Sequence, residues 1–141
     1  MATKMRLAKG NEELILVLEK LSGADADKIA KKALFEGADI VTNRVRANLW
    51  GTLSGEGTGD LFKSLGISSM RKNDSGWDVK IGFAGYDKHG TANQLKARIL
   101  ESGTTKQPKR PFFRPAVNST REAAKARIAE VIDREIGKIG G

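Results

Sequence analysis

The hydrophobic positions of this chain follow a helical spacing first and a strand spacing later. Between residues 25 and 49 apolar side chains recur every three or four positions, and charged residues occupy most of the others, which predicts the main helix. Gly37 interrupts this helix at a cost of about 1 kcal/mol relative to alanine, so a close packing contact is expected there. The apolar stripe consists of Ile29, Ala33, Ile40, Val41, Val45 and Leu49.

A two-residue period then predicts antiparallel strands. Residues 77–84 alternate between apolar side chains and polar or small ones, so one face of this strand should be buried and the other exposed to solvent. Residues 62–70 predict its partner, residues 73–76 have the composition of a turn, and residues 4–8 predict a short edge strand. The buried face would carry Trp77, Val79, Ile81 and Phe83, and the wet face Asp78, Lys80 and Gly82.

Further helices are expected on both sides of these strands. Asn11 should cap a short helix, and Thr91 should cap one that ends at Gly103. In a last helix, Ser119 with Glu122 matches a capping box, although Pro115 would also suit the first turn. The helix after Thr91 would bury Ala92, Leu95, Ile99 and Leu100, and the last one Ala124, Ile128, Val131, Ile132 and Ile139.

These elements predict an α+β fold in a single domain, residues 1–141. Long helices should pack on a small antiparallel sheet, and the last amphipathic helix should follow a connector rich in proline and phenylalanine. The 39% apolar content allows one modest core.

That connector, residues 103–115, contains all three prolines of the chain and two adjacent phenylalanines. Proline fixes φ and favours extended geometry in the preceding residue, so we expect a stiff, extended segment. Alternating side-chain directions would then bury one ring in the core and leave the other near a subunit contact, with the sequence leaving open which of Phe112 and Phe113 is buried. The basic residues around the rings are Lys106, Lys109, Arg110 and Arg114.

Residues 51–60 are rich in glycine and predict a flexible surface loop. The segment lacks the Gly-Lys-Ser/Thr ending of a phosphate-binding loop, follows a helix rather than a strand, and contains Glu56 and Asp60, which would repel phosphate. A flexible linker is the better interpretation.

Charge and residue types narrow the function. Lys and Arg total 25 against 17 Asp and Glu, a net charge of +8, which favours an acidic partner such as nucleic acid or an acidic protein surface. The chain has no cysteine and a single histidine, His89, which we interpret as a loop residue. We therefore expect no catalytic residue, no cofactor and no metal site. No apolar stretch is long enough to predict a membrane span.

Leu100–Thr104 reads apolar-Glu-x-Gly-Thr, and a short basic linker, Pro111–Ala116 and a long amphipathic helix follow it. This order resembles a family of small proteins from tailed phages and prophages, the head–tail joining, neck or tail-completion proteins, also called minor tail components. Thr58–Leu65 resembles the family's step from a long helix into the sheet. The resemblance covers nearly the whole chain, with departures at Ser102, often aromatic in the family, and at residues 96–100, which lack an aromatic pair.

The resemblance implies a structural virion protein that acts by assembly rather than catalysis. Copies would form a hexamer-like ring that contacts head-closure and tail-tube proteins. The protein would be in the host cytoplasm before assembly and in the virion, at the neck or tail, afterwards. A basic lumen would allow transient, non-specific contact with DNA. The alternative is a small basic nucleic-acid-binding protein that acts outside a particle. The candidate partner-binding residues are Thr104, Lys106, Lys109, Arg110, Phe112, Phe113, Arg114, Gly55, Gly57 and Gly59.

Overall fold

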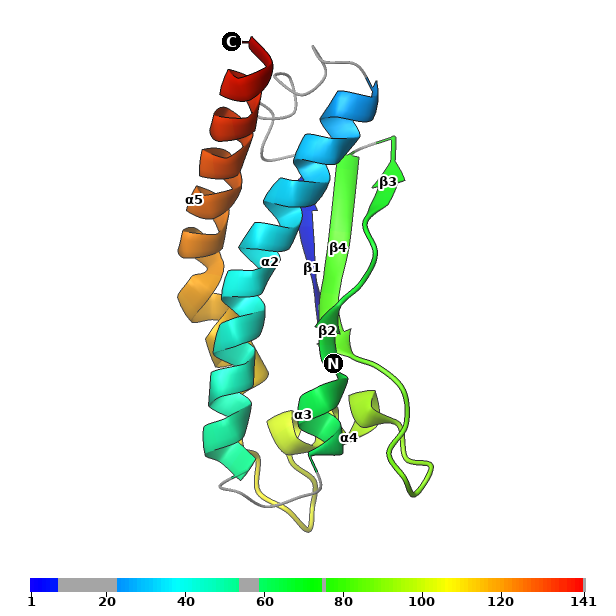
Figure 1. The fold of residues 1–141 in the computed structure, drawn as a ribbon. Coiled ribbons are helices and arrows are strands. Elements are labelled where there is room, and N and C mark those ends of the chain that lie inside the picture. The colour runs from blue at the N-terminus through cyan, green and yellow to red at the C-terminus, as the bar shows by residue number, and fades with distance from the viewer. Residues whose placement is uncertain (8–22, 54–58, 75, 141) are drawn as a thin grey trace.

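The computed structural model describes residues 1–7, 23–53, 59–74 and 76–140. It has the predicted α+β architecture, with long helices packed on a small antiparallel sheet (Figure 1). The helix predicted after Asn11 lies outside the described residues. The elements in chain order are β1 (Ala2–Leu7), α2 (Gly23–Leu53), α3 (Asp60–Ser64), β2 (Leu65–Ile67), β3 (Arg71–Asn73), β4 (Gly76–Phe83), α4 (Asn93–Ser102) and α5 (Phe113–Gly140).

Strand β4 is the centre of the sheet. It pairs along one side with β1, which confirms the predicted edge strand, and along the other side with β2 and β3. The turn between Asn73 and Gly76 joins β3 to β4, as predicted.

The partner strand predicted over residues 62–70 is wrong in part. Residues 62–64 belong to helix α3, residues 65–67 form β2, and residues 68–70 lead to β3, which begins only at Arg71. Leu61 and Leu65 are both buried at a separation of four, which is a helical spacing, and the Ser64 hydroxyl donates to the Leu61 carbonyl at 2.7 Å. The chain therefore completes one helical turn before it enters the sheet.

The predicted wet face of β4 also needs one correction. Lys80 is exposed, but Asp78 is only 5% exposed. Asp78 lies between two arginines in the sheet, because Arg6 on β1 and Arg71 on β3 are its register partners. Opposite charges on directly paired residues favour each other, although Oδ1 of Asp78 is buried without a hydrogen-bond partner among the described residues.

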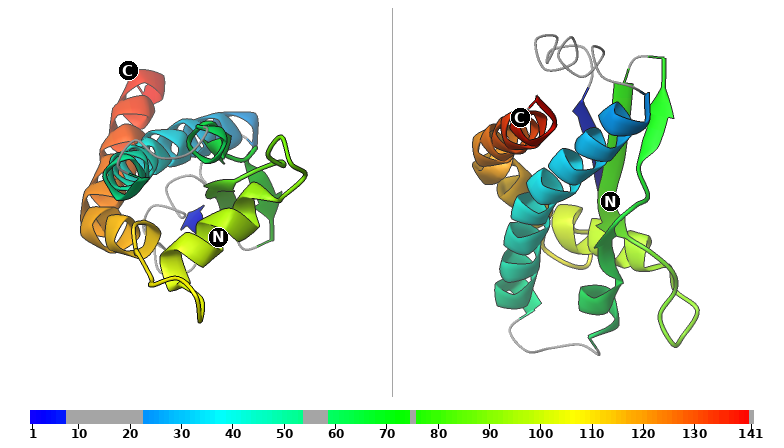
Figure 2. Two further views of the ribbon diagram at one scale, coloured as in Figure 1. Left: turned by 90° about the horizontal axis from the view of Figure 1, so that it is seen from below. Right: turned by 45° about the horizontal axis from the view of Figure 1, so that its top comes forward.

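Helix α2 packs on the sheet, and α5 packs along α2 in the opposite direction (Figures 1 and 2). Since α2 is covered on two sides, its buried surface is wider than the predicted stripe and includes Ala30 and Leu34. Of the predicted stripe, only Ile40 is half-buried rather than buried. The helix also continues through Leu53, so residues 51–53 are helical rather than part of the predicted loop, and residues 54–58 lie outside the described residues.

Gly37 allows α2 and α5 to approach closely, which confirms the expected packing contact. A Cβ atom added to Gly37 would lie 2.8 Å from Cγ1 of Ile128 and 3.3 Å from the carbonyl oxygen of Ala124. Both distances are shorter than ordinary carbon contacts. The glycine thus lowers helix propensity in return for contact between the two longest helices.

Helix α4 begins and packs differently from the prediction. Thr91 does not cap it; Ala92 precedes the first turn, without a side-chain cap. Asn93 is buried because its side-chain amide donates to the Ala84 carbonyl and its backbone N–H to the Gly85 carbonyl, which ties the start of α4 to the end of β4. This attachment turns Leu95 outward, 41% exposed, and buries Asn93, Ala97, Leu100 and Glu101.

We predict that Gly37→Leu lowers the free energy of unfolding by about 1–3 kcal/mol, because the added side chain overpacks the α2–α5 contact. Gly137→Leu is the control, since a Cβ at Gly137 in α5 meets no atom within 4 Å. Chemical denaturation of both variants measures the difference. Equal stability of the two variants would contradict the packing role of Gly37.

Candidate assembly surface

The carboxylate of Glu101 caps the amino-terminal end of helix α5. One of its oxygens accepts the backbone N–H of Phe112 at 2.9 Å and of Phe113 at 2.7 Å, and the other accepts that of Arg114 at 3.2 Å. Glu101 is only 7% exposed. The first N–H groups of a helix have no partner within the helix, and a negative charge there also suits the helix dipole. Glu101 therefore fixes where α5 starts.

The two residues that follow Ser102 shape the turn that allows this cap. Gly103 ends α4 with φ 75°, as predicted, and a Cβ there would lie 2.6 Å from the backbone nitrogen of Lys109. Thr104 exchanges backbone hydrogen bonds with Gln107, and its hydroxyl accepts the N–H of Lys106. The Glu-x-Gly-Thr motif therefore has a structural role. Glu101 caps α5, Gly103 allows the close approach of Lys109, and Thr104 forms the turn.

Phe112 and Phe113 are both buried, which corrects the prediction that one ring faces outward. Phe112 is 0% and Phe113 3% exposed, and their rings lie edge to face with centroids 6.3 Å apart. Both rings also contact the ring of Phe83 from β4. The prediction was wrong because the connector is not extended throughout: α5 begins at Phe113, so the two side chains do not alternate as in a strand.

The sequence offers two signals for the start of α5, Pro115 in the first turn and a capping box at Ser119, and the structure shows which is right. Pro115 lies in the first turn, where its missing N–H has no helical partner to lose, so this alternative is confirmed. The capping box is wrong, because Ser119 lies within the helix and its hydroxyl donates to the Ala116 carbonyl.

The basic side chains of the connector are solvent-exposed, namely those of Lys106, Lys109, Arg110 and Arg114. Arg110 is tied to the main helix, since its guanidinium donates to the Thr52 carbonyl at 3.4 Å. Thr52 lies in the last turn of α2, where a cation suits the helix dipole. The connector and the carboxyl end of α2 therefore meet at the lower end of the molecule in Figure 1.

Trp50 is exposed at the same end. Its side chain is 65% exposed, and its ring packs edge to face against Phe62 of α3 at a centroid distance of 5.8 Å. Gly59, one of the predicted partner-binding glycines, starts α3 with φ 81°, while Gly55 and Gly57 lie outside the described residues. We call Trp50, Phe62, Lys106, Lys109 and Arg110 the basal surface.

A second exposed aromatic residue, Tyr86, is 74% exposed in the loop between β4 and α4. Asp87 holds this loop: its carboxylate accepts the backbone N–H groups of Thr91 and His89, each at 2.9 Å, and pairs with Lys96. The hydrogen bond from Thr91, together with that from Lys96, lowers the pKa of Asp87 to about 2. His89 is an exposed loop residue, as interpreted from the sequence.

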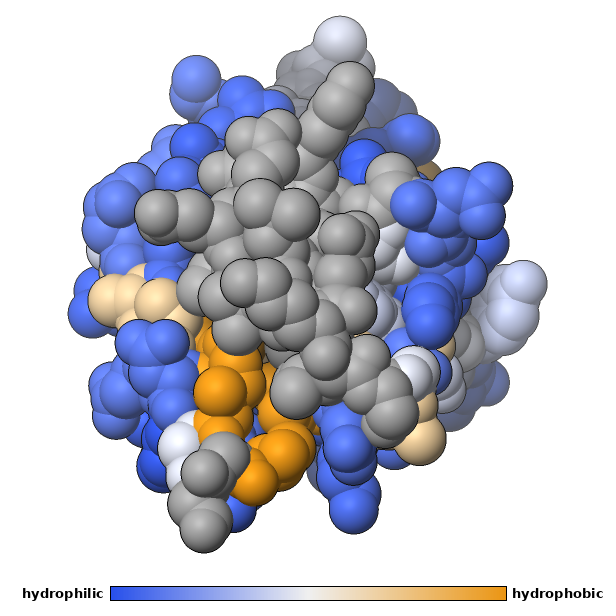
Figure 3. Space-filling view, turned by 90° about the horizontal axis from the view of Figure 1, so that it is seen from above, coloured by the Kyte–Doolittle hydropathy of each residue, from blue (hydrophilic) through white to orange (hydrophobic). Residues whose placement is uncertain are grey.

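The opposite end of the molecule is different in character. Figure 3 shows it from above, and most of its described side chains are hydrophilic around a small apolar strip. Ile139, near the carboxyl end of α5, is 48% exposed.

Sequence reasoning missed Glu101, Trp50 and Tyr86 as individual residues. The signal for Glu101 was available, because a glutamate in the last turn of a helix opposes the dipole of that helix and needs a partner elsewhere. For Trp50, the helical phase of residues 25–49 could have been extended by one position, which places it off the buried stripe.

We predict that Glu101→Ala lowers the free energy of unfolding by about 2–3 kcal/mol, since three N–H groups lose a charged acceptor. Glu101→Gln should lose less, because its carbonyl oxygen can still accept from Phe112 and Phe113. Glu122→Ala is the control, as that side chain is 88% exposed on α5. Thermal and chemical unfolding measure the three variants, and a loss for Glu101→Ala no larger than for the control would contradict the cap.

Comparison with known proteins places the chain in a family. Residues 12–103 match the HK97-gp10-like family model, described as "Bacteriophage HK97-gp10, putative tail-component". Comparison with curated proteins and with solved structures gives no match. The matched range covers most of the chain, from before α2 to the Glu101–Gly103 step that ends α4. This chain therefore belongs to the HK97-gp10-like family of phage tail components.

Proposed function

We propose that the chain forms a ring in the neck or at the head-proximal end of a phage tail, where its copies contact one another and the adjoining head-closure and tail-tube proteins. Family membership supports the broader statement, that this is a structural protein associated with a phage tail and with the virion. The family points to a non-enzymatic role, so the chain would act by assembly. No helix within the described ranges combines the length and hydrophobicity that a membrane crossing requires.

The observation that carries the proposal is the exposure of Trp50 at the carboxyl end of α2, the end to which Arg110 is also tied. Tryptophan and arginine are the residues most enriched among those that dominate binding energy at protein interfaces. Arg110 is held near the end of α2 by its bond to Thr52, and Trp50 leans on Phe62, so both side chains are positioned before a partner arrives. Positioned side chains lose less entropy on binding, which favours an assembly role.

The connector supplies charge to the same surface. Lys106, Lys109, Arg110 and Arg114 are exposed, whereas the neighbouring phenylalanines are buried and cannot stack on bases. The connector therefore carries charge with no exposed aromatic ring of its own, which suits loose phosphate contacts better than stacking along a single strand. This favours transient contact with DNA in a lumen over the alternative of a dedicated nucleic-acid-binding protein.

We predict that Trp50→Ala weakens assembly while the domain stays folded. A central aromatic contact contributes at least about 2 kcal/mol, roughly 30-fold in Kd per contact. The loss of the Trp50–Phe62 contact should reduce stability by no more than about 1.5 kcal/mol. Complementation of phage particles that lack the protein, with a melting curve of each variant, measures both effects. Ile139→Ala is the control, an exposed apolar residue at the opposite end; if both variants complete particles equally well, the basal surface is not an interface.

DNA binding distinguishes the proposal from the alternative. With four phosphate contacts, affinity for duplex DNA should fall roughly 100-fold between about 50 and 200 mM salt, and replacing the four basic connector residues by alanine should abolish most of that dependence. Fluorescence anisotropy with two unrelated sequences measures this. Tight binding to one sequence that changes little with salt would favour the nucleic-acid-binding alternative.

A further inference from the structure

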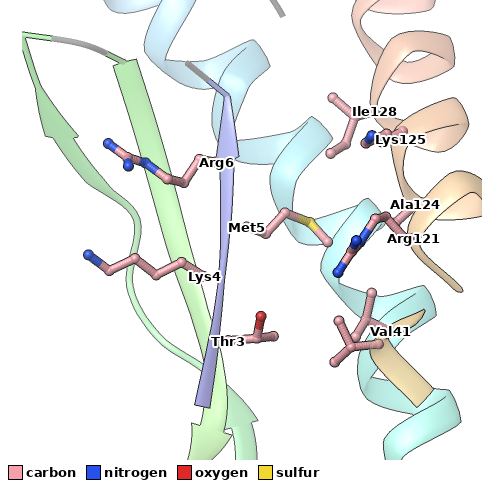
Figure 4. Close-up of a pocket in the computed structure, with 10 residues that line it drawn as sticks. Thr3, Lys4, Met5, Arg6, Val41, Arg121, Ala124, Lys125 and Ile128 are labelled. Atoms are coloured by element: carbon pink, nitrogen blue, oxygen red, sulfur yellow. The ribbon is translucent and has the colours of Figure 1, made fainter. Parts of the chain in front are cut away.

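A groove runs between strand β1 and helix α5, away from the basal surface (Figure 4). Its volume is 210 Å³, and α2 contributes Val41 to its floor. Thr3 and Met5 point from β1 toward the helices, whereas Lys4 and Arg6 point to the other side of the sheet. The groove is therefore bounded by one strand edge and one helix.

The edge of β1 that faces this groove has no neighbouring strand in the described part of the chain. The sheet order is β1, β4, β2, so β1 is terminal and pairs only through its other edge. The helical layer extends further than the sheet, because α2 covers the strands while α5 packs on α2 (Figure 2). The sheet thus stops short of α5, which leaves the groove where one more strand would lie.

The helical side of the groove combines apolar and basic side chains. Ala124 and Ile128 of α5 join Val41 in the apolar floor, while Arg121 and Lys125 rise from α5 at the rim (Figure 4). None of the described lining residues is acidic. Within α5, Arg121 contacts the Asn118 side chain at 3.4 Å, and Lys125 lies 3.7 Å from Glu122, an exposed pair that contributes little.

We propose that this groove binds an extended, acidic segment of a partner protein, which adds a strand to the edge of β1. Backbone groups on a terminal strand edge are a template for such pairing, and pockets for alternate side chains give it specificity. Charge complementarity identifies the segment as acidic. The nucleic-acid backbone offers no N–H and C=O ladder for β1 and nothing apolar for the floor.

The spacing of the two cations fits a strand. Arg121 and Lys125 are four residues apart on α5, which is about 6 Å along the helix axis. Side chains on one face of a strand repeat every two residues, about 6.7 Å. Carboxylates at positions i and i+2 of the added strand therefore match the two cations, and apolar side chains further along the same face match the floor. This inference is independent of the role of the basal surface.

A random ten-residue peptide library, selected on the full-length protein, tests the proposal without knowledge of the partner. Enriched peptides should carry Asp or Glu at i and i+2 with apolar residues on the same face. Arg121→Glu with Lys125→Glu should weaken the enriched peptide about tenfold or more, as expected when two rim charges are reversed. Lys31→Glu with Lys88→Glu changes the net charge equally at exposed positions outside the groove and should leave binding unchanged.

Amide NMR of the isotope-labelled protein with the enriched peptide locates the site. Shift changes should centre on residues 3–6, with cross-strand contacts between peptide and β1. Any of these results would overturn the proposal: no peptide whose binding depends on Arg121 and Lys125, shift changes centred elsewhere, or equal competition by single-stranded DNA, which would make the groove a general anion site. Strong protection of the outer β1 amides in the unbound protein would also overturn it.

Discussion

The contact between the Glu101 carboxylate and the first N–H groups of α5 determines how the carboxyl-terminal part of this protein is placed. It joins the end of one helix to the start of the next across a turn that Gly103 makes possible. Because Phe112 and Phe113 are themselves the capped residues, the same contact directs both rings onto Phe83 of the sheet. Helix α5 then reaches α2 at the level of Gly37, where only a glycine leaves room for Ile128. The ring cluster therefore depends on the cap at Glu101, and the close crossing of α5 and α2 at Gly37 depends on both.

Much of the fold could be predicted from the sequence because periodicity reports burial on one face. Helix α2, strand β4, the turn before it and the end of α4 at Gly103 all follow from local patterns. The errors occur where burial is decided by distant contacts. Asp78 looks like a surface residue until β1 and β3 place arginines on both sides of it. The apolar spacing after Thr91 predicts the wrong buried face for α4, because Asn93 ties that helix to β4.

The candidate site was predictable only in part for a related reason. Charge and glycine content directed attention to the connector, and the basic residues there are indeed exposed. A strand-like alternation for Phe112 and Phe113 failed because the position of a helix start depends on its cap, and the cap, Glu101, comes from another helix. The helical phase of α2 places Trp50 off the buried stripe, but its contact with Phe62 depends on where α2 ends relative to α3, which no local pattern records.

The family motif and the surface available to partners are therefore different sets of residues. Glu101, Gly103, Thr104 and the two phenylalanines are occupied with internal contacts, so their spacing preserves the position of α5 rather than a binding site. Residues that project from this scaffold, such as Trp50, Lys106 and Lys109, are free of that constraint. Side chains that project from such a scaffold can change without loss of the internal contacts that hold the fold.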